Sequence, residues 1–172
     1  EFARVSSLVA DYALANPSVA FSLDHDGSAT LSTPGTDRTD ALLGVYDRET
    51  ASRSTTVSAS VDLGAGGGDT GGAGDADPIS VDIAGALAYP SVTRSTRDHV
   101  RVSVNGRPVR NDRLAAAVRE GYGRLLPDGR EPVAAVDVSL PPDRVDPNVH
   151  PAKREVGLRD ADAVADAVAS VV

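Results

Sequence analysis

Two segments of this sequence concentrate the side chains that could do chemistry. The first spans residues 145–156, reads VDPNVHPAKREV and contains Lys153, the one lysine among 17 basic residues. A lysine ammonium is a compact point charge that suits a phosphate oxygen, where a planar guanidinium is bulkier. The polar and rigid residues at 146–151 fix the path of a loop that would present it. The alternative is a surface lysine without a chemical role, because one lysine must fall somewhere.

The second segment is rich in arginine. Residues 94–113 hold six Arg against two Asp, a local charge of +4 in a chain whose net charge is −8. Arg107, Arg110 and Arg113 lie on a turn that leads into a predicted helix, where guanidinium groups could contact phosphates. The alternative, which composition alone favours, is a solvated edge with charge pairs. Molar salt shortens the Debye length to about 3 Å and would reduce the affinity that each phosphate contact contributes.

Other chemistry is not indicated by the residues. Cysteine is absent, which excludes disulfides, cysteine-ligated metals and thiol nucleophiles and suits an intracellular chain. His25, His99 and His150 are isolated, so no metal site is expected, and we predict solvated positions for His25 and His99. A formal G-x-G-x-x-G within 66–71 precedes a strand and not a helix, which favours a hairpin tip over a phosphate site.

Composition indicates one globular domain. The chain has 172 residues, of which 41% are hydrophobic, and no apolar run approaches the ~18 residues of a membrane span. It holds 20 Asp against 5 Glu and 16 Arg against one Lys, a balance typical of a halophilic cytoplasm. Methionine is absent, so we expect a piece of a longer protein.

Hydrophobic periodicity predicts the elements that must position these segments. Val5, Leu8, Val9 and Tyr12 indicate an amphipathic helix that stops at Asn16. Further helices are predicted over about 37–47, over 112–126 with Leu125 on the buried face, and from 160 onward. Strands are predicted at 19–23 and 29–31, joined by an Asp-Gly turn, and at 57–63, 79–87, 100–104, 136–140 and 155–158, with loops at 64–78 and 141–153. The predicted fold is a single α+β domain, residues 1–172, with helices packed on a mostly antiparallel sheet.

The two segments together carry a resemblance to a known family. VNGRPV at 104–109, followed some forty residues later by VDPNVHPAKREV at 145–156, closely resembles the signature of the MutL family of DNA mismatch repair proteins. The opening residues 1–27, GYGRLL at 121–126 and REP at 130–132 are also similar, so the resemblance spans the chain. A departure is Ser103, which stands where the family usually has a larger apolar residue. The resemblance implies the left-handed β-α-β transducer fold, shared with a ribosomal protein domain and with gyrase-type transducers.

The resemblance also implies functional residues and partners. Lys153 would reach the γ-phosphate of ATP in an upstream GHKL-type ATPase domain. The loop that presents Lys153 would be held by Asn148, His150 and Pro151. The DNA-binding residues would be Arg107, Arg110 and Arg113. ATP and Mg²⁺ would be bound in the full-length protein and no cofactor by this piece alone, which should not hydrolyse ATP.

The implied partners are a second copy of the protein, MutS and DNA, with no membrane and a cytoplasmic, nucleoid-associated location. Two other interpretations stay open. One is the transducer of another GHKL machine, of the gyrase or type VI topoisomerase kind, which lacks this pair of signatures. The other is an interaction module in which Lys153 has no chemical role.

Overall fold

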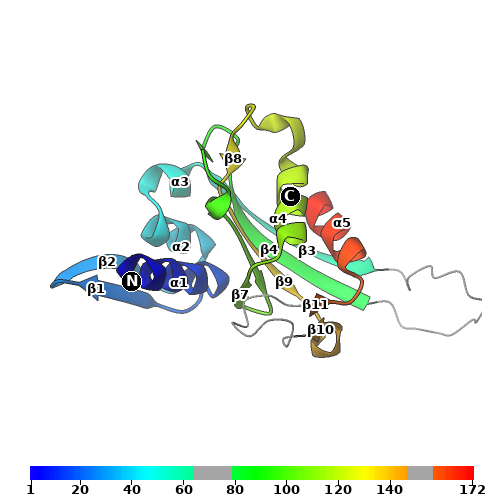
Figure 1. Ribbon diagram of the computed structural model, residues 1–172, viewed down its shortest axis with the longest axis horizontal. Helices are drawn as coiled ribbons and strands as arrows, with labels where there is room; N and C mark the ends of the chain where they lie inside the picture. Colours follow the sequence, from blue (N-terminus) through cyan, green and yellow to red (C-terminus); the bar gives the residue numbers. More distant parts are fainter. Residues whose placement is uncertain (64–78, 147–156) are drawn as a thin grey trace, which may run out of the picture.

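The computed structural model describes residues 1–63, 79–146 and 157–172, and a five-stranded sheet lies at its centre (Figure 1). The strands, in spatial order, are β3 (Ser54–Leu63), β4 (Ile79–Ala88), β9 (Ala134–Ser139), β6 (Val100–Val104) and β7 (Arg107–Val109). Every neighbouring pair is antiparallel except β6 and β9, which are parallel. The prediction of an α+β fold with a mostly antiparallel sheet is therefore confirmed.

One face of the sheet packs against two helices, α4 (Asp112–Tyr122) and α5 (Ala161–Val171), which Figure 1 shows side by side. The alternating apolar residues of the strands meet the apolar faces of both helices in the main core. The central members of this core are fully buried: Val81, Ile83, Val138, Val118, Val164 and Val168. Burial of each such side chain contributes about 1.5–3 kcal/mol, so this face dominates the stability of the fold.

The opposite face carries the N-terminal elements, drawn in blue and cyan in Figure 1. These are α1 (Phe2–Ala15), the hairpin of β1 (Phe21–His25) and β2 (Ser28–Thr33), α2 (Arg38–Val45) and α3 (Arg48–Ser52). A smaller core joins them to the sheet through Leu14 and Leu42, which pack with Ala86 of β4 and Ala135 of β9. The sheet is thus covered on both sides. Among these elements, α3 was not predicted from the sequence.

Helix α1 is present as predicted but packs through a different face. Ala10, Ala13 and Leu14 are buried, whereas Leu8 and Tyr12 are 39% and 38% exposed. The underlying strands present alanines, which admit a close approach of small side chains. The larger residues that indicated the helix therefore stay outside.

Helix α4 is shorter than predicted. The side chain of Asn111 accepts a hydrogen bond from the backbone N–H of Leu114 at 3.0 Å, which caps the helix at its start. The helix ends at Gly123, whose φ of +51° breaks the helical path, and a 3-10 turn, η2 (Gly123–Leu125), follows. Leu125, predicted on the buried face, is consequently 68% exposed.

The remaining elements are short. They are β5 (Thr93–Arg94), η1 (Arg97–His99), β8 (Glu131–Pro132), η3 (Pro142–Arg144), β10 (Val145–Asp146) and β11 (Gly157–Leu158). The predicted loop at 141–153 therefore contains η3 and β10, and of the predicted strand at 155–158 the described part is β11. The predicted loop at 64–78 lies outside the described residues, but β3 and β4 pair from Leu63 and Ile79 onward, as a hairpin requires. Across the described ranges, no helix has the length and hydrophobicity to cross a bilayer.

Candidate functional site

The first signature segment in chain order, VNGRPV at 104–109, forms the tight turn between β6 and β7. Asn105 and Gly106 have φ values of +51° and +73°, which suit an Asn-Gly hairpin turn. The carboxylate of Asp137, on the neighbouring strand β9, accepts hydrogen bonds from the Gly106 N–H at 3.0 Å and from the Ser103 hydroxyl. Ser103 is thus a buried donor that holds Asp137 beneath the turn.

The turn is also tied to two other elements. The Asn105 amide donates to the carbonyl of Leu140 at 3.0 Å and accepts from the N–H of Leu140 at 2.8 Å. On the other side, the Asn16 amide at the end of α1 donates to the carbonyl of Gly106 at 2.9 Å. The turn therefore joins α1 to the end of β9, where the chain enters the second signature segment.

The second signature segment, VDPNVHPAKREV at 145–156, starts in β10 and is followed directly by β11. These two strands form the base of the segment. β10 pairs with β11, so that Asp146 lies opposite Gly157. An ion pair between Arg144 and Asp160 at 3.3 Å and a backbone hydrogen bond from Arg159 to Arg144 at 3.0 Å reinforce this base. The predicted site residues of this segment lie outside the described residues: Asn148, His150, Pro151 and Lys153.

The arginine-rich segment borders a groove of about 840 Å³ between α1 and the strands β6 and β7. Arg107 and Arg110 both line this groove, together with Leu8 and Tyr12 of α1. Arg113 is separated from them, because it forms an ion pair with Asp162 of α5 at 2.6 Å. The structure thus brings together two of the three predicted DNA-binding arginines.

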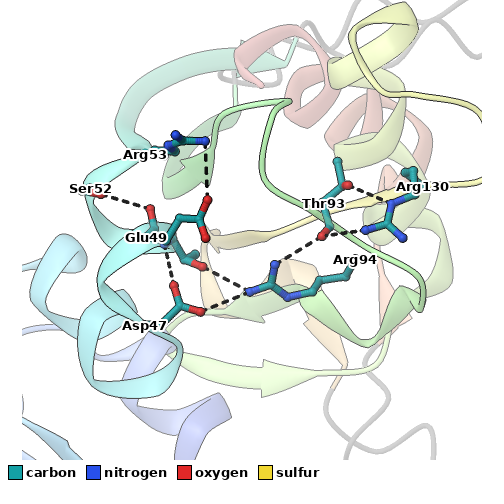
Figure 2. A network of polar contacts seen from close by, with 8 residues as sticks. Asp47, Glu49, Ser52, Arg53, Thr93, Arg94 and Arg130 are labelled. Carbon is teal, nitrogen blue, oxygen red and sulfur yellow. Dashed lines mark hydrogen bonds and ion pairs between the residues drawn. The ribbon is translucent and has the colours of Figure 1, made fainter.

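Four of the six arginines of this segment are held by carboxylates on other elements. The pairs are Arg94 with Asp47, Arg97 with Glu131, Arg101 with Asp11, and Arg113 with Asp162. Figure 2 shows the first of them, in which Arg94 reaches Asp47 at the start of α3. The charge-pair interpretation therefore describes these four. Arg110 is exposed and, within the described residues, has neither an ion pair nor a hydrogen bond of its side chain.

Arg101 forms the most buried of these pairs, at the wall of the groove. Burial opposes its charge, but Tyr46 and Asp11 together outweigh burial and raise the pKa of Arg101. The Arg101 guanidinium also donates to the Tyr46 hydroxyl at 3.3 Å. Since Asp11 is on α1 and Tyr46 follows α2, one guanidinium ties the N-terminal layer to the sheet.

The two described histidines differ in environment. His25 has a side chain 47% exposed, at the end of β1, and stacks on Phe2 with ring centroids 3.9 Å apart. His99 is less solvated than predicted, because it is only partly exposed, its ring lies 5.7 Å from that of Tyr46 and its Nδ1 is buried. Burial lowers the pKa of His99, and the nearby Arg101 and Arg94 lower it further.

The side-chain hydrogen bonds of Asn105 and Asp137 were not predicted from the sequence. The signal for Asn105 was its place in an Asn-Gly dipeptide after an alternating strand, which identifies the turn but not the side-chain bonds. Asp137 alternates with Val136 and Val138, which places it on the face away from the main core. Its donors Ser103 and Gly106 come from β6 and from the turn after it, which no local pattern indicates.

Comparison with known proteins identifies the family. A family model described as DNA mismatch repair protein, C-terminal domain, matches residues 71–172. The DNA mismatch repair protein MutL of Halobacterium salinarum is 42% identical over 172 residues, which cover 98% of this chain and 23% of that protein. The chain belongs to the MutL family. MutL of Halalkalibacterium halodurans is 36% identical over 157 residues, or 91% of this chain and 22% of that protein.

Solved structures have the same fold. The crystal structure of the N-terminal domain of a DNA repair protein aligns with a TM-score of 0.77 and 22% identity, over 98% of this chain and 51% of that one. The Aquifex aeolicus MutL ATPase domain complexed with ADP aligns with a TM-score of 0.51 and 18% identity, over 82% of this chain and 43% of that one. The chain spans about a quarter of the length of the curated MutL relatives that it matches.

The position of His99 predicts a pH dependence of stability. Because its pKa is lowered from 6.5, the unfolded chain takes up a proton at a higher pH than the folded chain does. The free energy of unfolding should therefore fall as the pH drops from about 7.5 to about 5.5, and His99→Gln should flatten this fall. Urea titrations across this range measure it. A wild-type slope in His99→Gln would contradict the assignment.

Proposed function

We propose that this chain is the transducer part of a MutL-type mismatch repair ATPase and supplies Lys153 to the γ-phosphate of ATP in an adjoining GHKL-type domain. The observation that carries the proposal is the arrangement of the two signature segments. Both follow strands of one parallel pair, β6 and β9, and therefore leave the same edge of the sheet. The chain is fixed on both sides of residues 147–156, by η3 and β10 before them and by β11 after them.

The chemistry of the segment fits a phosphate. An ammonium carries three hydrogen-bond donors and a localised charge. The pairing of β10 with β11 fixes the two ends of the segment that carries it. ATP and Mg²⁺ belong to the upstream domain in this proposal, and this chain contributes the lysine. The ADP bound to the Aquifex aeolicus MutL ATPase domain supports a nucleotide in the longer protein.

The proposed consequence is a switch. A lysine supplied from a second domain touches the γ-phosphate while that group is present and is released after hydrolysis. The angle between the two domains would then follow the nucleotide state. Through this angle we propose that ATP controls pairing with a second copy of the protein and the passing of a mismatch signal from MutS.

We also propose that the groove edge contributes to DNA binding. Arg110 supports this best, because it is exposed and its charge is not neutralised by a carboxylate among the described residues. Arg107 lines the same groove. Arg113 contributes less in this account, since Asp162 already offsets its charge.

The lysine is tested by Lys153→Ala in a longer protein that joins the upstream domain to this chain. ATP turnover in molar KCl should fall about a hundredfold, which corresponds to about 2.7 kcal/mol of lost transition-state stabilisation. Arg159→Ala is the matched control, because it removes an exposed cation just beyond β11, and it should leave turnover unchanged. Unchanged turnover in Lys153→Ala would refute the proposal and favour the interaction module.

The DNA edge is tested by Arg110→Glu combined with Arg113→Glu in the same longer protein. Binding of duplex DNA should weaken, and the slope of log affinity against log salt should fall by about one for each phosphate that the variant no longer neutralises. Arg110→Glu alone should account for most of the loss. Arg48→Glu combined with Arg124→Glu, which changes the net charge equally at exposed positions of α3 and η2, is the control. Equal affinities of the double variant and the control would exclude these arginines.

A further inference from the structure

The parallel pairing of β6 and β9 has a feature at its end that the proposed function does not use. In a parallel ladder, a residue that donates its N–H to one residue of the neighbouring strand accepts, through its own carbonyl, from the residue two positions further along. Asn105 donates its backbone N–H to the carbonyl of Val138 at 3.0 Å. The regular partner for the Asn105 carbonyl would therefore be the N–H of Leu140.

The turn prevents this regular bond. At Asn105 the backbone enters the left-handed region with a φ of +51°, and the chain turns back toward β7. The side chain replaces the missing carbonyl, since Oδ1 of Asn105 accepts from the N–H of Leu140 at 2.8 Å. Nδ2 of Asn105 donates to the carbonyl of the same residue at 3.0 Å. One side-chain amide thus adds a further rung to the parallel ladder.

Asparagine is the residue type that meets all of these requirements. It tolerates a positive φ better than other residues with a side chain, and its amide both donates and accepts. Glycine would keep the turn but lose both bonds to Leu140. Aspartate would keep the acceptor, lose the donor and add a charge near Asp137, whose carboxylate already accepts from the Gly106 N–H.

The rung determines where the chain leaves the sheet. Leu140 is 7% exposed and packs in the main core, and Pro141 and η3 follow directly. Only Pro141, η3 and β10 separate Leu140 from residue 147. Because the Asn105 amide bonds both the N–H and the carbonyl of Leu140, the short chain segment from Leu140 to Asp146 starts from a fixed position.

We propose that Asn105 is a positioning residue for the segment that carries Lys153, and that it acts by anchoring Leu140. This inference rests on the proposed function of Lys153. A displacement of about 1 Å at a catalytic contact can cost up to about a hundredfold in rate. Loss of the rung should therefore lower ATP turnover, although the proposal gives Asn105 no contact of its own with the nucleotide.

The test is a double-mutant cycle in the longer protein, with ATP turnover at saturating ATP measured below the unfolding temperature of each variant. Asn105→Gly should lower turnover about tenfold in the wild-type background. The turnover of Asn105→Asp should lie between those of the wild type and Asn105→Gly. In the Lys153→Ala background, Asn105→Gly should cause no further loss, because its effect passes through the lysine. A role in stability alone would lower turnover by the same factor in both backgrounds.

Asp26→Gly is the matched control. Asp26 and Gly27 form the β1–β2 turn with φ values of +50° and +77°, close to those of Asn105 and Gly106, and the Asp26 side chain is 91% exposed. Turnover unchanged by Asn105→Gly, or lowered equally in both backgrounds, would overturn the inference. Turnover unchanged by Lys153→Ala would instead refute the proposed function, so the two failures are distinguishable.

Discussion

The parallel pairing of β6 and β9 is the constraint on which the rest of the structure depends. Two parallel strands need a crossover between them, and here α4 provides it and covers the main core on the way. The same pairing brings the carboxyl ends of both strands to one edge. Asn105, in the first signature segment, is thereby brought next to Leu140 and bonded to it, at the point where the chain leaves β9 toward the second segment. The candidate site follows from the topology and not from any local motif.

The sequence predicted the elements more accurately than their partners. Alternation located β3, β4, β6 and β9, because a strand with one buried face has a period of two. The same patterns could not show that β6 lies parallel to β9, since periodicity carries no information about pairing. The buried face of α1 was missed because alanines on the sheet select small side chains there, and Leu125 was missed because Gly123 ends α4 early. Lys153 was identified by resemblance, whereas the role of Asn105 could not be predicted, since its side chain bonds to Leu140, some 35 residues further along the chain.

The charges show how an acidic chain can contain an arginine-rich edge. Most of the arginines between 94 and 113 are paired with carboxylates from α1, α3, β8 or α5, so they connect layers of the fold. Arg101 is the clearest example, because it is largely buried and contacts both Asp11 and Tyr46. At high salt such buried pairs are screened less than exposed ones. The exposed Arg110, which has no carboxylate partner among the described residues, is therefore the side chain that we propose for a phosphate contact.

The central claim is that Lys153 reaches a nucleotide held by another domain. A crystal structure of the longer protein with Mg²⁺ and a non-hydrolysable ATP analogue tests it most directly. We predict that Nζ of Lys153 lies about 3 Å from a γ-phosphate oxygen, with the Asn105 amide still bonded to Leu140. A structure in which the analogue is bound and Lys153 points into solvent, with no phosphate oxygen within about 6 Å, beyond the reach of a direct hydrogen bond, would contradict it.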